Sequence, residues 1–157
     1  NTESPGKRER IYKMVKGLLA KKVPIHGVGL QGHWSLDAPN EQELKKSIQQ
    51  FASLGLQVQI TELDVTVYTQ EHSARQRRPE DTASFTAAQE QRQIDQYKMF
   101  FRVFRENKKA LTGVTFWNIS DRRTWLDNFP MPGRKNYPLL FNERNQPKRV
   151  YWEVVKF

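Results

Sequence analysis

Apolar residues recur every three or four positions in four stretches of the chain, the pattern of a helix with one buried face. The first stretch follows Pro5, and proline is favoured at the first helical position. Capping pairs precede the next two stretches: Asn40 with Glu43, and Thr86 with Gln89. The residues expected to face inward are Ile11, Met14, Val15, Leu18 and Leu19; Leu44, Ile48, Phe51 and Ala52; Ile94, Tyr97, Phe101 and Phe104; and, after Pro147, Val150, Tyr151, Val154 and Val155.

Runs of apolar and β-branched residues lie between these helices, at 25–30, 57–65 and 113–118, and are predicted to be strands. Strands that alternate with single helices are expected to be parallel and covered by those helices. The sequence therefore predicts an α/β fold. In such folds the chemistry gathers at the carboxyl ends of the strands.

Each predicted strand ends in residues capable of binding or catalysis. They are Gln31 and His33, Glu62 and Asp64, and Trp117 and Asn118. Two carboxylates two residues apart are hard to explain by stability, because they repel each other and bury poorly without partners. The alternative is that both acids are solvated at the edge of a loop. The coincidence of three such strand ends favours a functional site.

The strand before Glu62 carries an unexplained polar row. Regular alternation groups Val58 and Ile60 with Glu62, and places Gln57, Gln59 and Thr61 on the opposite face. That face is expected to meet helices, so its polarity does not fit the pattern.

Length and composition are typical of one folded domain. The chain has 157 residues, of which 37% are hydrophobic, 27% charged and none cysteine. The absence of cysteine excludes disulfides, thiolate chemistry and cysteine zinc sites. No apolar run approaches the roughly 20 residues that span a bilayer, so no membrane association is expected. The chain begins at Asn1 without a signal peptide, and we expect a processed or truncated product.

The formal charge of +9 raises the possibility of a nucleic-acid partner. The basic residues, however, are spread over helix-like segments and the long polar loop predicted at 66–85, and no nucleic-acid-binding motif accompanies them. We therefore interpret them as a solvated basic surface and expect no nucleic acid.

Two kinds of chemistry suit the strand-end residues. His33, Glu62 and Asp64 could supply a nitrogen and two oxygens to a metal, but such sites usually have more ligands, and His26 and His72 lie elsewhere. Tryptophans near the acids favour a carbohydrate instead. Trp117, Trp125 and Trp34 are candidates to stack on sugar rings, with core packing as the alternative for each; for Trp152 core packing is expected. No metal or other cofactor is predicted.

Several motifs together resemble the C-terminal half of glycoside hydrolase family 10 endo-β-1,4-xylanases, over residues 1–157. The motifs are Gly27-Val28-Gly29-Leu30-Gln31-Gly32-His33, Ile60-Thr61-Glu62-Leu63-Asp64-Val65, Val114-Thr115-Phe116-Trp117, Ser120-Asp121 with Thr124-Trp125-Leu126, Pro138-Leu139-Leu140-Phe141, and Pro147-Lys148 with Tyr151. The resemblance implies part of a (β/α)8 TIM barrel, about strands six to eight and helices five to eight, and retaining hydrolysis of xylan. It also implies secretion or a periplasmic or cell-surface location, because xylan lies outside the cell.

The resemblance also implies roles for individual residues. Glu62 matches the nucleophile, His33 the histidine bonded to it, and Asp64 the carboxylate that holds the histidine. Trp117 and Trp125 match tryptophans around the cleaved sugar, and two further substrate-binding candidates are Gln31 beside the catalytic pair and Asn118 at a strand end.

A retaining glycosidase needs a second carboxyl group as acid/base, roughly 5 Å from the nucleophile. The family carries it at the end of strand four, and Asn1 already matches the segment past strand five. We therefore expect residues 1–157 to be the C-terminal half of one catalytic barrel, with xylan or a xylo-oligosaccharide as substrate and the complementary N-terminal half as partner. The alternative is a catalytically silent carbohydrate- or protein-binding barrel relative.

Overall fold

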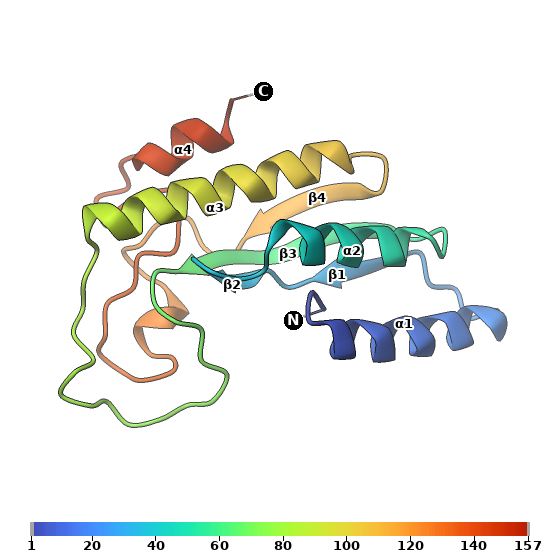
Figure 1. Ribbon diagram of the computed structural model, residues 1–157, viewed down its shortest axis with the longest axis horizontal. Helices are drawn as coiled ribbons and strands as arrows, with labels where there is room; N and C mark the ends of the chain where they lie inside the picture. The colour runs from blue at the N-terminus through green and yellow to red at the C-terminus, as the bar shows by residue number, and fades with distance from the viewer. Residues whose placement is uncertain (1, 157) are drawn as a thin grey trace. The chain divides into compact units, whose positions relative to one another are not determined.

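A computed structural model describes residues 2–156. The three predicted strands are present and alternate with helices, and the structure adds a short strand, β2, that was not predicted and follows β1 without a helix between them (Figure 1). In order they are α1 (Pro5–Ala20), β1 (Gly27–Leu30), β2 (His33–Ser35), α2 (Glu41–Ala52), β3 (Gln57–Thr66), α3 (Ala87–Glu106), β4 (Leu111–Phe116), the 3-10 helix η1 (Trp125–Asp127) and α4 (Arg149–Val154). The last strand ends two residues earlier than predicted, and α4 begins at Arg149 rather than at Pro147.

The strand β3 is the centre of the sheet, because β1, β2 and β4 all pair with it. The strand β1 runs parallel to β3, as predicted, and β2, which was not predicted as a strand, also runs parallel to it. The carboxyl ends of β2 and β3 thus lie at the same edge of the sheet.

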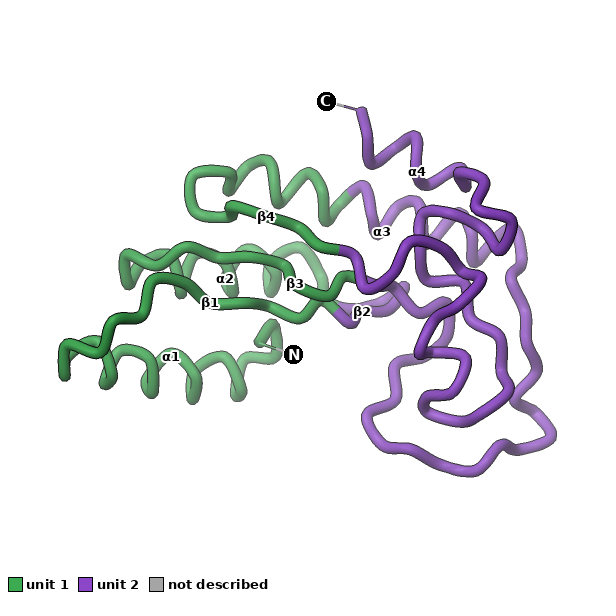
Figure 2. Tube along the Cα trace, turned by 180° about the vertical axis from the view of Figure 1, so that it is seen from behind, with its two compact units in different colours: residues 1–32, 39–63, 99–115 green, residues 33–38, 64–98, 116–157 purple. Residues whose placement is uncertain are grey.

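The chain forms two compact units, coloured separately in Figure 2. The first contains the chain up to Gly32, Pro39–Leu63 and Met99–Thr115; the second contains His33–Ala38, Asp64–Lys98 and the chain from Phe116 onward. The single domain expected over residues 1–157 stays a prediction.

The first unit has its core between α2 and the strands. Asn40 caps α2 by accepting a bond from Glu43 N at 2.9 Å, as the sequence predicts. The apolar face of α2 packs on the strands. The helix lies in front of the strands in Figure 1 and behind them in Figure 2, which shows the opposite side. The fully buried residues here include Leu44, Ile48 and Phe51 on α2 and Val58 and Ile60 on β3.

The predicted apolar stripe of α1 is only partly correct. Val15 is buried, but Met14 is 58% exposed. A buried arginine attaches α1 to α2 instead: Arg8 is 6% exposed and donates to Glu43 Oε2 at 2.8 Å and to Gln50 Oε1 at 3.0 Å. The Arg8 hydrogen bond also lowers the pKa of Glu43. The contact between the two helices is therefore largely polar.

The polar row of β3 does not meet helices, because Gln57 and Gln59 are exposed, and a change of register follows it along the strand. Leu30 pairs with Ile60 and His33 pairs with Asp64, so two residues on one side face three on the other. One extra residue in β3, a β-bulge, reverses the inward and outward positions. Val58 and Ile60 before the bulge, and Leu63 and Val65 after it, are all fully buried. The expected grouping of Glu62 with Val58 and Ile60 is therefore wrong.

The second unit is held together by a buried ion pair. Lys148 Nζ lies 2.9 Å from Asp121 Oδ2, and the two side chains are 6% and 1% exposed. Asp121 also accepts from Leu139 N, and Lys148 donates to Tyr137 O. Burial raises the pKa of Asp121 and lowers that of Lys148, and their pairing offsets part of each shift. The pair joins the segment after β4 to the start of α4.

Two apolar predictions for α3 and α4 need correction. On α3, Phe100 is fully buried rather than Phe101, although Ile94, Tyr97 and Phe104 are buried as expected. On α4, Val150 and Val154 are buried, whereas Val155, which follows the last helical residue, is 36% exposed. The error on α3 is one position, which turns a side chain by 100° around the helix, and the error on α4 arises because the helix ends before Val155.

Candidate functional site

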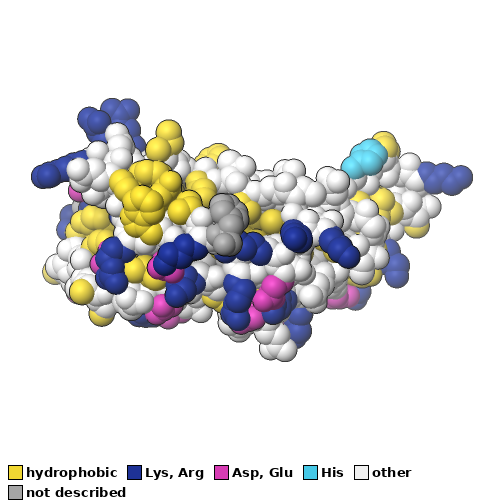
Figure 3. Space-filling view, turned by 90° about the horizontal axis from the view of Figure 1, so that it is seen from above, with side chains coloured by type: hydrophobic (Ala, Val, Ile, Leu, Met, Phe, Trp, Pro, Cys, Tyr) yellow, Lys and Arg dark blue, Asp and Glu magenta, His cyan; other side chains and the backbone are white. Residues whose placement is uncertain are grey.

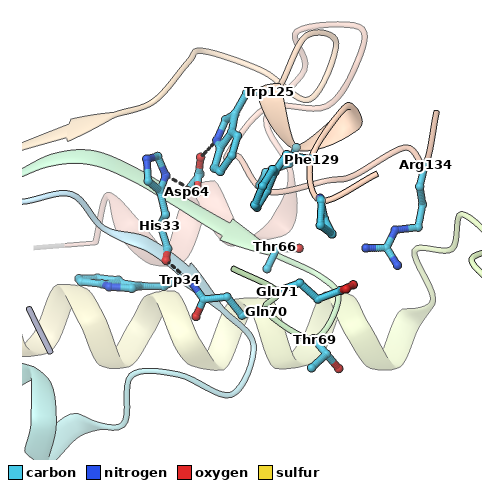
Figure 4. Close-up of a pocket in the computed structure, with 12 residues that line it drawn as sticks. His33, Trp34, Asp64, Thr66, Thr69, Gln70, Glu71, Trp125, Phe129 and Arg134 are labelled. Carbon is cyan, nitrogen blue, oxygen red and sulfur yellow. Dashed lines mark hydrogen bonds and ion pairs between the residues drawn. The ribbon is translucent and has the colours of Figure 1, made fainter. Parts of the chain in front are cut away.

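Three side chains of the second unit form one hydrogen-bonded cluster (Figure 4). His33 Nδ1 lies 3.0 Å from Asp64 Oδ1, and Trp125 Nε1 donates to Asp64 Oδ2 at 2.7 Å. Asp64 is 1% exposed, so its carboxylate is held by these side chains away from solvent. Because an ionised carboxylate only accepts hydrogen bonds, this contact places the neutral His33 proton on Nδ1.

The His33 ring lies between two tryptophans. Its centroid is 4.9 Å from the Trp125 ring and 6.2 Å from the Trp117 ring, both in edge arrangements. Trp117 is 48% exposed and Trp125 is 36% exposed, whereas large apolar side chains are usually covered. Two uncovered indoles beside an imidazole form a surface on which a sugar ring can stack.

The strand positions explain why these residues meet. His33 opens β2 and is the direct partner of Asp64 on β3, so the two side chains stand next to each other. Trp125 begins η1, where Thr124 Oγ1 accepts a bond from Leu126 N. The sheet thus supplies the acid and the histidine, and a capped turn supplies the indole.

Glu62 and Gln31 lie together in the first unit. The backbone N of Glu62 donates to the backbone O of Gln31 at 2.7 Å. The Glu62 side chain is half-buried and Gln31 is exposed. Glu62 also precedes Asp64 on β3 by two residues, the spacing that points side chains to the same face of a strand.

The Asn118 side chain bonds to its own loop. Asn118 Oδ1 accepts from Ile119 N at 2.7 Å, and Nδ2 donates to Arg123 O at 2.5 Å. The residue has a φ of 147°, and these bonds support that backbone conformation. Its predicted contact with substrate stays a prediction.

Two predictions about tryptophans are wrong. Trp34, a candidate sugar platform, is 1% exposed and belongs to the core of the second unit, because β2 turns it inward. Trp152, expected in the core, is 56% exposed because it lies on the outer side of α4. Whether a tryptophan points into the core or toward solvent cannot be predicted without knowing the register of the strand or helix that carries it.

Sequence reasoning missed two residues that support the cluster. Gln70 Nε2 donates to the backbone O of His33 at 2.6 Å, and Phe129 stacks on Trp125 with ring centroids 5.1 Å apart. Both are visible in Figure 4. They come from long irregular segments, and no local pattern marks them.

A small cavity lies beneath the cluster, against Thr66, Gln70, Phe129 and Arg134. Its volume of about 30 Å³ holds about one water molecule, so a sugar cannot enter it. Trp117 and Trp125 keep exposed surface outside this cavity. Among residues 2–156 there is no group of three or more His, Cys, Asp or Glu side chains arranged to hold a metal ion, and no helix long and apolar enough to cross a membrane.

These features define a class of protein. The fold is an α/β sheet with parallel strand pairs, and on or beside its strands lie acids, an imidazole and uncovered indoles, the groups found in enzymes and binding proteins that act on sugars. Within this class the chain belongs to glycosyl hydrolase family 10, whose sequence profile matches residues 1–157.

Two curated relatives match 96% or more of the chain. It is 46% identical to a β-1,4-xylanase of Dictyoglomus thermophilum over 100% of its length and 43% of the relative's. It is 44% identical to an endo-1,4-β-xylanase of Geobacillus stearothermophilus over 96% of its length and 44% of the relative's. The chain thus spans about half the length of these relatives.

Solved structures give the same coverage. An endo-1,4-β-xylanase of Caldicellulosiruptor owensensis matches with a TM-score of 0.92 and 43% identity, over 100% of this chain and 46% of that one. A mutant structure in complex with xylotriose matches with a TM-score of 0.92 and 44% identity, over 100% and 47%. The fold of this chain is therefore about half of a family 10 (β/α)8 barrel, as the resemblance implied.

Proposed function

We propose that the chain carries the nucleophile side of an endo-acting, retaining β-1,4-xylanase. The supporting observation is the buried Asp64 carboxylate, which accepts from both His33 and Trp125 beside uncovered indole surface. Family membership and relatives named as xylanases support xylan as the substrate.

Glu62 is the proposed nucleophile. Its ionised carboxylate attacks the anomeric carbon, forming a glycosyl–enzyme ester while the bond to the leaving sugar breaks; water then cleaves the ester. His33 is the proposed donor to Glu62 through Nε2, since Nδ1 is engaged by Asp64. A donor at that point fixes the direction of the attacking carboxylate.

The second carboxyl group belongs to the remainder of the barrel. It protonates the leaving oxygen and later removes a proton from the attacking water. Since relatives are about twice as long, we propose that the complementary N-terminal half, on the same or a separate chain, is the required partner. Trp117, Trp125, Gln31 and Asn118 are the proposed contacts to the sugar on this side.

The test is the Glu62→Gln variant of this chain, assayed for xylan cleavage as part of the complete barrel. The amide keeps the shape of the side chain but cannot form the ester, so release of reducing ends from xylan should fall at least ~10³-fold. The control is Glu80→Gln, which neutralises an exposed acid in the loop after β3 and should leave the rate unchanged.

Two outcomes would count against the proposal. Undiminished activity of Glu62→Gln would remove Glu62 from the nucleophile role. Binding of xylotriose without hydrolysis by the complete wild-type barrel would support the catalytically silent relative instead.

Since xylan lies outside the cell, we also propose that the protein is exported.

A further inference from the structure

Asp64 is bonded on both of its oxygens by different side chains. Oδ1 lies 3.0 Å from His33 Nδ1, and Oδ2 accepts from the indole N–H of Trp125 at 2.7 Å. With a single donor, a carboxylate can still turn about its Cβ–Cγ bond. Two donors on opposite oxygens leave one orientation, and burial to 1% exposure prevents water from replacing either.

Trp125 is itself held in one position. One face of its ring stacks on Phe129 at 5.1 Å and an interplanar angle of 25°. The turn beneath it is capped by Thr124, and the indole N–H is directed at Asp64 (Figure 4). The ring is therefore a fixed donor, although 36% of the residue remains exposed.

We propose that the Trp125 indole N–H is a positioning group for the reaction, acting through Asp64 on His33, in addition to any contact of its ring with sugar. This inference rests on the proposed function. Trp125 fixes the plane of the Asp64 carboxylate, the carboxylate keeps the proton of His33 on Nδ1, and Nε2 of His33 is thereby presented to the nucleophile.

Loss of the N–H would leave Asp64 Oδ2 without this donor inside the protein. The carboxylate would then rotate toward another donor, and the histidine would lose its fixed direction. Small displacements of catalytic groups cost up to about 100-fold in rate. Because sugar stacking requires only the ring, substrate affinity should change much less than turnover.

The first test compares Trp125→Phe with Trp117→Phe in the complete barrel. Both variants replace an indole by a smaller ring near His33, but only Trp125 donates to Asp64. We expect Trp125→Phe to lower kcat roughly 10- to 100-fold with a small change in KM, and Trp117→Phe to act mainly on KM. Equal effects of the two variants on kcat would overturn the proposal.

A sulfur-for-nitrogen replacement covers the case in which Trp125→Phe does not fold. Benzothienylalanine at position 125 keeps the size of the indole and its stack on Phe129 but has no N–H. It should reproduce the loss of kcat. Full activity with this side chain would show that the ring alone matters.

The second test uses a double-mutant cycle with Asp64→Asn. If Trp125 acts through Asp64, Trp125→Phe should lower kcat less than about 2-fold further in the Asp64→Asn background. Additive losses would contradict the proposed route. The cycle thus separates positioning through Asp64 from a direct effect of the ring on the sugar.

A spectroscopic measurement makes the test independent of activity. The ¹⁵N resonances of the His33 ring should show a single Nδ1–H form near neutral pH in the wild type and in Trp117→Phe, and a mixture of forms in Trp125→Phe. An unchanged His33 spectrum in Trp125→Phe would overturn the inference. A wild-type barrel that shows the expected spectra but does not cleave xylan would contradict only the proposed function.

Discussion

Gly32 shows how one residue constrains the approach to the site. Its φ is +89°, a conformation that favours glycine, and a Cβ built there would lie 2.8 Å from Ile60 Cγ2 and 3.3 Å from the Leu63 Cα. The residue stands between β1 and β2, directly before His33. Both the backbone conformation and the lack of space therefore require glycine.

We predict that Gly32→Ala lowers the free energy of unfolding by about 2–4 kcal/mol, the combined effect of left-handed strain and overpacking. Gly17→Ala is the matched control. Gly17 lies in α1, and no atom comes within 4 Å of the point that an added methyl group would occupy, so alanine should stabilise the helix by up to about 1 kcal/mol. Urea denaturation of both variants measures the difference, and equal stabilities would contradict the explanation.

At the residue scale, strand-end chemistry was predictable and its supports were not. His33 and Asp64 were expected to meet because parallel strands bring their ends together; in the structure His33 opens β2 and Asp64 lies opposite it within β3. Gln70 and Phe129 contact the cluster from distant parts of the chain, and nothing in their local sequence indicates it. The Trp125 bond to Asp64 likewise spans 61 positions.

At the scale of elements, the loop from Val67 to Thr86 is ordered by charge. Arg75 bonds both oxygens of Asp81, at 2.6 and 2.8 Å, and both oxygens of Glu71, at 2.5 and 3.0 Å. The hydrogen bonds from Arg75 lower the pKa of Asp81 and of Glu71. A segment without helix or strand thereby keeps a defined conformation beside the site.

This network predicts that the loop opens in acid. A carboxyl group whose pKa is lower in the folded chain than in the unfolded chain stabilises the folded chain. This contribution is fully present above the pKa of the unfolded chain, about 4, and is lost as the pH falls from there through the pKa of the folded chain. Hydrogen exchange in the loop, corrected for the intrinsic rate, should be faster at pH 3 than at pH 6. In the Arg75→Gln variant, hydrogen exchange in the loop should be fast at both pH 3 and pH 6. Equal protection of the wild-type loop at the two pH values would refute the prediction.

The elements themselves differ in how far sequence determines them. Helix starts at Asn40 and Thr86 depend on bonds within four residues, and both capping bonds are present as predicted. The bulge in β3 depends on which residues of a neighbouring strand it meets, so alternation within β3 alone gave the wrong face for Glu62.

At the scale of the whole chain, the positive charge is distributed. Lys and Arg side chains in Figure 3 are interspersed with Asp and Glu over the visible face. Two exposed arginines, Arg122 and Arg123, lie between Trp117 and Trp125 in the sequence. The loop that carries them is held by the Asn118 side chain and by the buried Asp121. These two positive charges suit carboxylates, such as the uronic acids that substitute some xylans, the proposed substrate.

We predict that the complete barrel turns over glucuronic-acid-bearing xylan faster than the same polymer after carboxyl reduction, at low salt. Arg122→Gln with Arg123→Gln should reduce this preference roughly 2- to 5-fold, the size expected of exposed ion pairs. Lys21→Gln with Lys22→Gln, at the end of α1, removes the same charge and should leave the ratio unchanged. Equal turnover of neutral and acidic xylans by the wild type would exclude the preference.

The extra residue in β3 can be removed without changing how the rest of the strand pairs. Without any one of Thr61, Glu62 and Leu63, two residues of β3 would lie opposite Gln31 and Gly32, and His33 would still pair with Asp64. Val65 would keep the face of Val58 and Ile60, because simple alternation would then run through the whole strand. A deletion here should therefore remove a side chain beside the site and leave the pairing of His33 with Asp64 in place, whereas a deletion in β2 or later in β3 would shift that pairing.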